Sequence, residues 1–376
     1  MFSNLRRGGR FGGRLLQANA HRLSSPLKLN LALTYWCQYK CKTCNIWRRR
    51  PTDELTTREL LTFVRENPNI SWLDVTGGEI FLRDDIGEIF ESITDSWRDL
   101  FLLHFPTNGF LTKKIVPVVE QLGRSGVPNV VVTISIDGDR NLNDDIRGIT
   151  GGFDRQIETL NALRAVAGVR AVVGMTVSRF NVGQIQKTFD AVQALTPGLT
   201  MSDFHVNFAQ VSEHYYGNAE DEVAAPKDEV TRELQWYRSQ RGTARSPAAW
   251  LEGTFLRELE TYLKTGTTPM HCHSLRSSCF IDPWGTVFPC ITYTRPLGRL
   301  RDTGMRLAPI WENVETRTTQ REIWNGSCPQ CWTACEAYQS ILGNLVRPRS
   351  LTPPASPPAR QPAAESIPIT LTGTRK

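Results

Sequence analysis

The feature that most constrains the fold is a repeat of one apolar, β-rich segment followed by one amphipathic segment, which fills the first half of the chain. The apolar runs are short, and the segments between them have helical periodicity over roughly 10–15 residues. The expected strands are Lys28–Trp36, Trp72–Thr76, Leu100–Phe105, Val130–Ile136, Ala171–Val177 and Phe204–Phe208. The expected helices are Thr56–Asn67, Asp84–Trp97, Thr112–Gly126, Gly152–Val166 and Gly183–Leu195.

Strands that alternate with helices predict right-handed βαβ units around a parallel sheet. Six repeats are fewer than the eight of a closed TIM barrel, so we expect an open, partial (β/α)6 barrel over residues 28–210. Two further helical segments, Lys227–Gln240 and Ala248–Thr265, predict a helical linker over residues 211–270. No run approaches the roughly 18 consecutive apolar residues of a membrane span, so we expect no transmembrane helix.

The two ends of the chain differ in composition from its middle. Residues 1–52 hold 11 of the 44 basic side chains and no carboxylate, which leaves a mildly acidic body behind them. We therefore expect a basic mobile arm over residues 1–27, and the acidic body argues against nucleic acid as a partner. A lipid- or RNA-binding segment around Leu15–Leu23 is the alternative for the arm. Seven prolines in the last thirty residues predict a disordered tail over residues 344–376.

The nine cysteines fall into two groups. We find no apolar leader segment and expect a cytoplasmic protein, in which clustered cysteines usually indicate metal or redox chemistry. Cys37, Cys41 and Cys44 follow the first expected strand, where loops line the active face of a barrel. Three thiolates can hold three irons of a cubane cluster and leave the fourth iron open for a small molecule. A zinc site would need a fourth ligand, and residues 45–69 contain no Cys or His.

Polar, glycine-rich motifs follow the next three expected strands. They are Thr76-Gly77-Gly78-Glu79, Thr107-Asn108-Gly109, Ser135-Ile136-Asp137-Gly138 and Asn143-Asp144-Asp145-Ile146-Arg147-Gly148. Each alone could be ordinary turn chemistry. Glycines let backbone approach a ligand closely, and Glu79 could accept a hydrogen bond from an ammonium group. Arg147 could pair with a carboxylate of the ligand or form a salt bridge to Asp144 or Asp145.

In this order, the C-x3-C-x2-C loop and the later motifs resemble the radical S-adenosylmethionine (radical SAM) superfamily over about residues 28–210. The resemblance implies that Cys37, Cys41 and Cys44 bind a catalytic [4Fe-4S] cluster, whose open iron is chelated by S-adenosylmethionine. It implies reductive cleavage of this cofactor to a 5′-deoxyadenosyl radical that abstracts hydrogen from the substrate. An electron donor such as flavodoxin or ferredoxin is expected with it.

The same resemblance implies a cofactor site along the carboxyl ends of the strands. The residues it implies are Gly77, Gly78 and Glu79 at the methionyl amino group, Ser135 and Asp137 near the ribose and carboxylate, and Asn108 and Arg147. Two positions depart from the family pattern. The usual proline after the glutamate is Ile80, and the residue before the third cysteine, often an aromatic adenine contact, is Thr43. Tyr39 or a residue of the fifth or sixth strand could replace this contact.

The second group of cysteines lies near the C-terminus, in an expected module over residues 271–343. Its members are Cys272, Cys279, Cys290, Cys328, Cys331 and Cys335. The first three bracket a hairpin turn signal, Asp282-Pro283-Trp284-Gly285, and the last three form a C-x2-C-x3-C block.

This arrangement resembles the SPASM/twitch extension of radical SAM enzymes, which binds auxiliary iron–sulfur clusters. Six cysteines suffice for one fully ligated cluster and not for two. We expect one auxiliary [4Fe-4S] cluster, held by hairpin cysteines and one or more of the block. The two spare cysteines would be inert thiols, partial ligands of a second cluster or a hydrogen donor. A structural zinc site at Cys272, flanked by His271 and His273, is the alternative.

These motifs together predict a radical SAM oxidoreductase. The SPASM resemblance implies a peptide substrate that is oxidised or cross-linked at an unactivated C–H bond. A small-molecule substrate is one alternative, and the basic arm suggests RNA or a lipid-linked substrate as another. A metal-binding scaffold that has lost catalysis is the non-enzymatic alternative.

Overall fold

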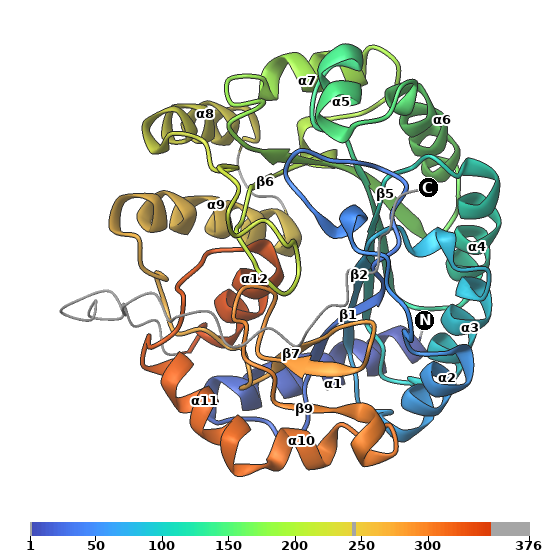
Figure 1. Cartoon of the computed structure of the whole chain (residues 1–376), viewed down its shortest axis with the longest axis vertical. Coiled ribbons are helices and arrows are strands. Elements are labelled where there is room, and N and C mark those ends of the chain that lie inside the picture. The colour runs from blue at the N-terminus through green and yellow to red at the C-terminus, as the bar shows by residue number, and fades with distance from the viewer. Residues whose placement is uncertain (1, 243–245, 347–376) are drawn as a thin grey trace, which may run out of the picture.

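The structure, a computed structural model, describes residues 2–242 and 246–346 (Figure 1). Its strands form one sheet in the order β6-β5-β4-β3-β2-β1-β7-β8-β9. Strands β1 to β6 and the pair β1·β7 are parallel. The strands are β1 (Lys28–Thr34), β2 (Trp72–Gly77), β3 (Leu102–Thr107), β4 (Asn129–Ser135), β5 (Val169–Val177), β6 (Phe204–Phe208), β7 (Ser278–Ile281), β8 (Thr286–Phe288) and β9 (Gly298–Arg299).

The helices between the parallel strands cover the convex face of the sheet, as Figure 1 shows. They are α2 (Thr57–Glu66), α3 (Ile86–Ser96), α4 (Thr112–Arg124), α5 (Arg140–Arg147), α6 (Gly152–Arg164) and α7 (Ile185–Gln193). Short 3-10 turns are η1 (Ile46–Arg48), η2 (Ile80–Leu82), η3 (Met201–Asp203) and η4 (Leu300–Thr303). Within the described residues the sheet does not close, which confirms the expected partial (β/α)6 barrel.

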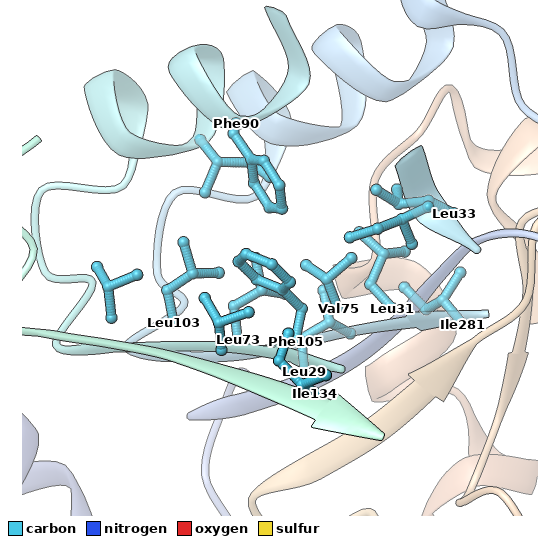
Figure 2. Close-up of a cluster of buried hydrophobic side chains, with 14 of the residues drawn as sticks. Leu29, Leu31, Leu33, Leu73, Val75, Phe90, Leu103, Phe105, Ile134 and Ile281 are labelled. Carbon is cyan, nitrogen blue, oxygen red and sulfur yellow. The ribbon is translucent and has the colours of Figure 1, made fainter. Parts of the chain in front are cut away.

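Alternation along the strands separates an apolar outer face from a polar inner face. Leu29, Leu31 and Leu33 of β1 pack with neighbouring strands and with Phe90 of α3 on the outer face (Figure 2). The intervening positions of the strands place polar side chains on the inner face. Among these are Lys28, Asn30, Asp74, His104, Thr133, Ser135, His205 and Ser278. The inner face can therefore offer hydrogen bonds and charges to a ligand.

The C-terminal module continues the barrel sheet. Strand β7 pairs with β1 in parallel, from Lys28 opposite Ser278 to Leu31 opposite Ile281. Strands β7 and β8 form the antiparallel hairpin that the turn signal predicted. The sequence pattern gave no sign of the β1·β7 pair, because it joins segments about 250 residues apart in the chain.

The remaining helices are α8 (Lys227–Gln240), α9 (Pro247–Thr265), α10 (Ala308–Glu312), α11 (Val314–Trp324) and α12 (Ala334–Gly343). Helices α8 and α9 lie where the linker was expected. Helix α9 packs on α12, and both lie on the concave side of the sheet in Figure 1. The expected linker therefore helps to enclose the inner face.

The N-terminal segment is helix α1 (Phe2–Ala20), which corrects the expectation of a mobile arm. Its arginines find acceptors on the body of the protein. Arg7 donates to two backbone carbonyls, and Arg10 pairs with Asp99 at 2.6 Å. The ring of Phe11 stacks on Phe101 with centroids 4.8 Å apart. The expected tail lies largely outside the described residues, and no described helix is long and apolar enough to span a membrane.

Candidate active site

The cysteine loop after β1 is held from two sides by backbone hydrogen bonds. Lys40 N donates to the carbonyl of Arg147 at 3.1 Å, and Lys42 N donates to the carbonyl at position 146 at 2.8 Å. On the other side, Asn45 N donates to the carbonyl of Tyr216 at 2.8 Å. The loop with Cys37, Cys41 and Cys44 thus lies between the end of α5 and the segment that follows β6.

Two glycines of the sequence motifs let other elements reach this loop. Gly78 N donates to the carbonyl of Thr34 at 2.7 Å, and a Cβ at this position would overlap the carbonyl oxygen of Trp36. Gly148 has φ +64°, and a Cβ there would lie 2.6 Å from the carbonyl oxygen of Lys40. Glycine is therefore required at both positions because the backbone contacts the cysteine loop. The sequence had suggested close approach to a ligand as the reason.

Glu79 joins the motif after β2 to the motif after β3. Its buried carboxylate accepts from the hydroxyl of Thr107 at 2.9 Å, from Asn108 N at 2.7 Å and from Phe81 N at 3.3 Å. Burial raises the pKa of Glu79 to about 7, although these hydrogen bonds act in the opposite direction. Glu79 therefore fixes the geometry of the two motifs beside the cysteine loop.

Arg147 pairs with Asp137, and neither of the alternative salt bridges forms. Asp144 instead accepts from backbone N–H groups at the start of α6, and Asp145 pairs with a lysine of the cysteine loop. Asp137 also accepts from Thr176 N at 2.8 Å. The buried ion pair links β4, β5 and α5 at the edge where the cysteine loop lies.

The chemistry of the side chains around this loop fits the cluster and cofactor. Among the described residues, the buried polar atoms near this loop that lack a hydrogen-bond partner include Gln38 Oε1, Tyr39 OH, Asn108 Nδ2 and Arg147 Nε. Donors and acceptors left unpaired at one place are what a polar ligand would satisfy. They belong to the cysteine loop and to the motifs that contact it.

The three thiols of the loop also fit bound iron. Burial raises the pKa of Cys37 and of Cys44 to about 12, and repulsion from the thiolate of Cys41 adds to both shifts. A coordinating metal ion removes such a proton and offsets this repulsion. Over residues 2–242 and 246–346, no three His, Cys, Asp or Glu side chains are grouped to hold a single metal ion. A cubane separates its sulfur ligands more widely than a single ion does, so the fit to a cluster stands.

The remaining cofactor candidates lie along the same edge. Ser135 is the last residue of β4 and is half-buried. The carbonyl of Thr43 accepts from Asn218 at 2.9 Å, so the segment after β6 covers the position where an aromatic residue was expected. Tyr39 is buried, with its ring edge-on to Phe110 at 6.0 Å.

Four of the six C-terminal cysteines form one group. Burial raises the pKa of Cys272, and the thiolates of Cys331 and Cys328 act on it in the same direction. Burial raises the pKa of the Cys290 thiol well above its usual range, and the charges of Glu336 and of the Cys331 thiolate act in the same direction. The hydroxyl of Thr292 lies 3.3 Å from the sulfur of Cys290 and 3.7 Å from that of Cys331. These four thiols are close enough to act on one another.

The two other C-terminal cysteines lie apart from this group. Cys279 is buried on the outer face of β7, in the main hydrophobic core. Cys335, at the start of α12, packs in a small cluster that also contacts Cys37 and Cys44. The flanking histidine His271 has its Nδ1 2.8 Å from the carbonyl of Trp324.

The segment after β6 covers the active face in a way that the pattern of strands and helices does not predict. Tyr215 of this segment bonds to the hydroxyl of Thr76, and Arg49 donates to the carbonyl of His214 at 2.7 Å. Strand–helix periodicity cannot place an irregular segment. The run of polar and aromatic residues just after the sixth expected strand was the only signal available.

Family models match both parts of the chain. The radical SAM superfamily model matches residues 31–192, and the iron–sulfur cluster-binding SPASM model matches residues 272–332. Among curated proteins, the chain is similar to mycofactocin maturase MftC of Mycobacterium ulcerans (strain Agy99). The two are 26% identical over 365 residues, which cover 90% of this chain and 88% of the relative.

A shorter match is to a probable GTP 3′,8-cyclase of Saccharolobus islandicus (strain L.S.2.15 / Lassen #1). It is 28% identical over 181 residues, which cover 46% of this chain and 56% of the relative.

Solved structures share the fold. Streptococcus suis SuiB bound to the precursor peptide SuiA superposes with a TM-score of 0.58 at 16% identity, over 84% of this chain and 71% of that one. The enzyme anSMEcpe with bound AdoMet and the Cp18Cys peptide gives 0.55 at 16% identity, over 80% and 84%. The chain is a radical SAM enzyme with a SPASM domain, and it belongs to the superfamily whose members bind a [4Fe-4S] cluster and S-adenosylmethionine.

Proposed function

We propose that this enzyme matures a peptide, by oxidising or cross-linking it at an unactivated C–H bond. The observation that carries the proposal is the extent of the similarity to mycofactocin maturase, which runs through both the barrel and the C-terminal module. The solved SuiB structure with its precursor peptide adds that this fold accommodates a peptide.

We assign the catalytic cluster to Cys37, Cys41 and Cys44. When bound, the cluster and S-adenosylmethionine supply a 5′-deoxyadenosyl radical that abstracts a hydrogen atom. The chain's own residues hold the loop and orient the cofactor. Glu79 and the Asp137–Arg147 pair fix the three motifs around the loop.

The cofactor itself would contact groups that these motifs leave free. Asn108 Nδ2 and Arg147 Nε offer unpaired donors, which suit the carboxylate and hydroxyl oxygens of S-adenosylmethionine. Gly77, Gly78 and Ser135 complete the proposed cofactor site, with backbone groups or a hydroxyl at the same edge of the sheet.

We assign one auxiliary cluster to Cys272, Cys290, Cys328 and Cys331, the group whose thiols act on one another. Four thiolates ligate a [4Fe-4S] cluster fully. Cys279 and Cys335 are left outside this set. A flavodoxin or ferredoxin would supply the electron for the catalytic cluster, in the cytoplasm.

A small-molecule substrate is the second candidate. It draws on the similarity to a probable GTP 3′,8-cyclase, which covers less than half of this chain. The RNA and lipid alternatives were based on a free basic arm. They lose support because Arg7 and Arg10 of α1 bond to the body of the protein.

The test uses the short peptides encoded next to the gene for this enzyme. Anaerobically reconstituted enzyme, S-adenosylmethionine and a strong reductant are incubated with each peptide, and products are read by mass spectrometry. The proposal predicts a loss of about 2 Da per oxidation, with one 5′-deoxyadenosine formed per event. The Cys37/Cys41/Cys44→Ala variant is the control. If 5′-deoxyadenosine forms while every such peptide stays unchanged, the peptide assignment fails and the small-molecule alternative gains.

A further inference from the structure

His205 lies on the inner face of the barrel, level with the proposed cofactor site. It is the second residue of β6, between Phe204 and Val206, which face the outer core. In the sheet register Ser135 of β4 pairs with Gly174 of β5, and Gly174 pairs with His205. Two strand spacings separate His205 from Ser135, a distance of roughly 10 Å. Gly174 has no side chain, and the methyl group of Thr133 from β4 lies over it, 2.4 Å from where a Cβ would be.

The imidazole of His205 is oriented by a carboxylate from another element. Its Nδ1 lies 3.3 Å from Oε1 of Glu252, a buried residue of α9. Tyr338 of α12 donates its hydroxyl to Oε2 of the same carboxylate. Among the described residues Nε2 has no hydrogen-bond partner, and 26% of the His205 side chain is exposed. One ring nitrogen thus lies within ion-pair distance of a buried carboxylate oxygen that has no hydrogen-bond partner, and the other nitrogen has no partner among the described residues.

Charges around Glu252 keep this carboxylate ionised. Burial alone would raise its pKa, but the nearby His205 imidazole and the charge of Arg241 lower the pKa to about 2. Arg241 also donates to the hydroxyl of Tyr237 at 2.6 Å. Whenever the ring is neutral, an ionised carboxylate beside Nδ1 favours the tautomer with its proton on Nδ1 and its lone pair on Nε2.

The other histidine on the inner face of the barrel strands does not have this arrangement. His104 of β3 has Nδ1 3.2 Å from Asp74 and Nε2 3.0 Å from the hydroxyl of Thr133. Both of its nitrogens are therefore engaged within the protein, and it serves as a matched comparison for His205.

We propose that Nε2 of His205 accepts the proton released when the substrate is oxidised, with Glu252 as its positioning residue. This inference rests on the proposed function. After the 5′-deoxyadenosyl radical has removed one hydrogen atom, the carbon-centred radical must lose one electron and one proton to form a new double bond or cross-link. The electron passes to a one-electron acceptor of the iron–sulfur class, for which the auxiliary cluster is the candidate. The proton leaves an adjacent N–H, O–H or C–H bond for Nε2, so the substrate loses two hydrogens in all.

The position of α12 supports the assignment of the electron to the auxiliary cluster and of the proton to His205. The helix begins at Ala334, three residues after Cys331 of the proposed auxiliary set, and Tyr338 contacts Glu252 one turn later. Helix α12 therefore adjoins the proposed auxiliary cluster and also contacts Glu252, the residue that positions His205.

The experiment compares the full-length reconstituted enzyme with His205→Gln, Glu252→Gln and His104→Gln. General-base catalysis contributes about 10²–10⁴-fold, so His205→Gln should lower product formation by at least about 100-fold. Formation of 5′-deoxyadenosine should stay near the wild-type rate, because that step precedes proton loss. The His104→Gln variant should form product at close to the wild-type rate. Wild-type product formation in His205→Gln, or an equal loss in His104→Gln, would overturn the proposal.

A second measurement needs neither cluster nor turnover, and so keeps this test separate from that of the proposed function. In cluster-free protein labelled with ¹⁵N-histidine, NMR should show neutral His205 protonated at Nδ1. Glu252→Gln should populate the Nε2-protonated form, and Glu252→Asp should restore the wild-type form. A wild-type ring protonated at Nε2, or one that is unaffected by Glu252→Gln, would remove the proposed role. A wild-type enzyme that leaves peptides unchanged would count against the proposed function instead.

Discussion

At the scale of single residues, glycines decide whether the cysteine loop can be held in place. Gly78 and Gly148 allow the end of β2 and the end of α5 to reach the loop backbone, and at each position a Cβ would collide with a carbonyl oxygen. The motifs that contain them could be recognised from the sequence. Their contact with the loop could not, because it depends on which strand ends meet in space.

Replacing Gly78 with Ala should displace the cysteine loop. The added Cβ would overlap the carbonyl oxygen of Trp36 and lie 3.1 Å from Cβ of Cys37. Neither atom belongs to the flexible end of a side chain, so the loop backbone itself would have to move. We expect loss of about four of eight irons per chain, loss of 5′-deoxyadenosine formation, and destabilisation of about 1–3 kcal/mol. Iron analysis and urea unfolding measure these effects.

The matched control is Gly87→Ala in α3. The nearest atom to its added Cβ would be 3.9 Å away, so the free energy of unfolding should rise by about 0.5–1 kcal/mol with full iron content. A Gly78→Ala enzyme with wild-type iron would show that the loop does not depend on this contact.

At the scale of elements, α12 is fixed to the inner face of the sheet by a buried polar network. Glu336 accepts from the amide of Asn30 and from the hydroxyl of Ser278, both at 3.1 Å. Lys28 bonds to the carbonyl of Cys335 and to Gln339 at 3.0 Å. This helix was not expected from the sequence, where its first two residues were interpreted as the end of the cysteine block and the rest only as part of the C-terminal module.

The network predicts a pH dependence of stability. Burial raises the pKa of Glu336 to about 7, against the opposing charge of Lys28, whereas the unfolded chain titrates near its ordinary value of about 4.3. Between these values the folded protein holds a proton at Glu336 that the unfolded chain has lost, so the contribution of Glu336 to the free energy of unfolding should fall as pH rises through this window. Urea unfolding of cluster-free protein at several pH values measures this fall.

The fall should be smaller in Glu336→Gln, where this group no longer titrates. Other groups set the pH dependence that remains in this variant, because the pKa of Glu79 is raised to about 7 and that of His214 is lowered to about 4. An identical pH dependence in both proteins would show that Glu336 is not protonated in the folded state.

The elements that the sequence predicted well are those governed by local periodicity. Helix α8 and strand β6 have the expected bounds, and the other barrel elements differ by a few residues at their ends. Helix α5 was not predicted from the sequence, because its eight residues are mostly polar and were interpreted as the Asp-Asp-Ile-Arg motif of a loop. The pairing of His205 with Glu252 joins residues 47 positions apart on different elements, and no local pattern reports such a contact.

At the scale of the whole molecule, the barrel and the C-terminal module share one sheet through the β1·β7 pair. The limits that the sequence gave for separate domains stay predictions, but the shared sheet implies that the two parts stabilise each other. Without residues 271–346, strand β1 would become an exposed edge next to a polar inner face.

Removing the C-terminal module should therefore prevent stable folding of the barrel. A chain of residues 1–270 should be insoluble or show no cooperative unfolding transition, whereas the full chain should unfold in one transition. Calorimetry and circular dichroism of both chains distinguish the cases. Two separate transitions in the full chain, or a stable truncated barrel, would show that the parts fold independently.

We propose that one chain holds a catalytic cluster at Cys37, Cys41 and Cys44 and a single auxiliary cluster in the SPASM domain. The most direct test of this proposal is to count iron and acid-labile sulfide after anaerobic reconstitution, and to assay 5′-deoxyadenosine formed from S-adenosylmethionine under a strong reductant. We predict about eight irons per chain, and about four with no cofactor cleavage in the Cys37/Cys41/Cys44→Ala variant. Wild-type protein that binds no iron and forms no 5′-deoxyadenosine would contradict it.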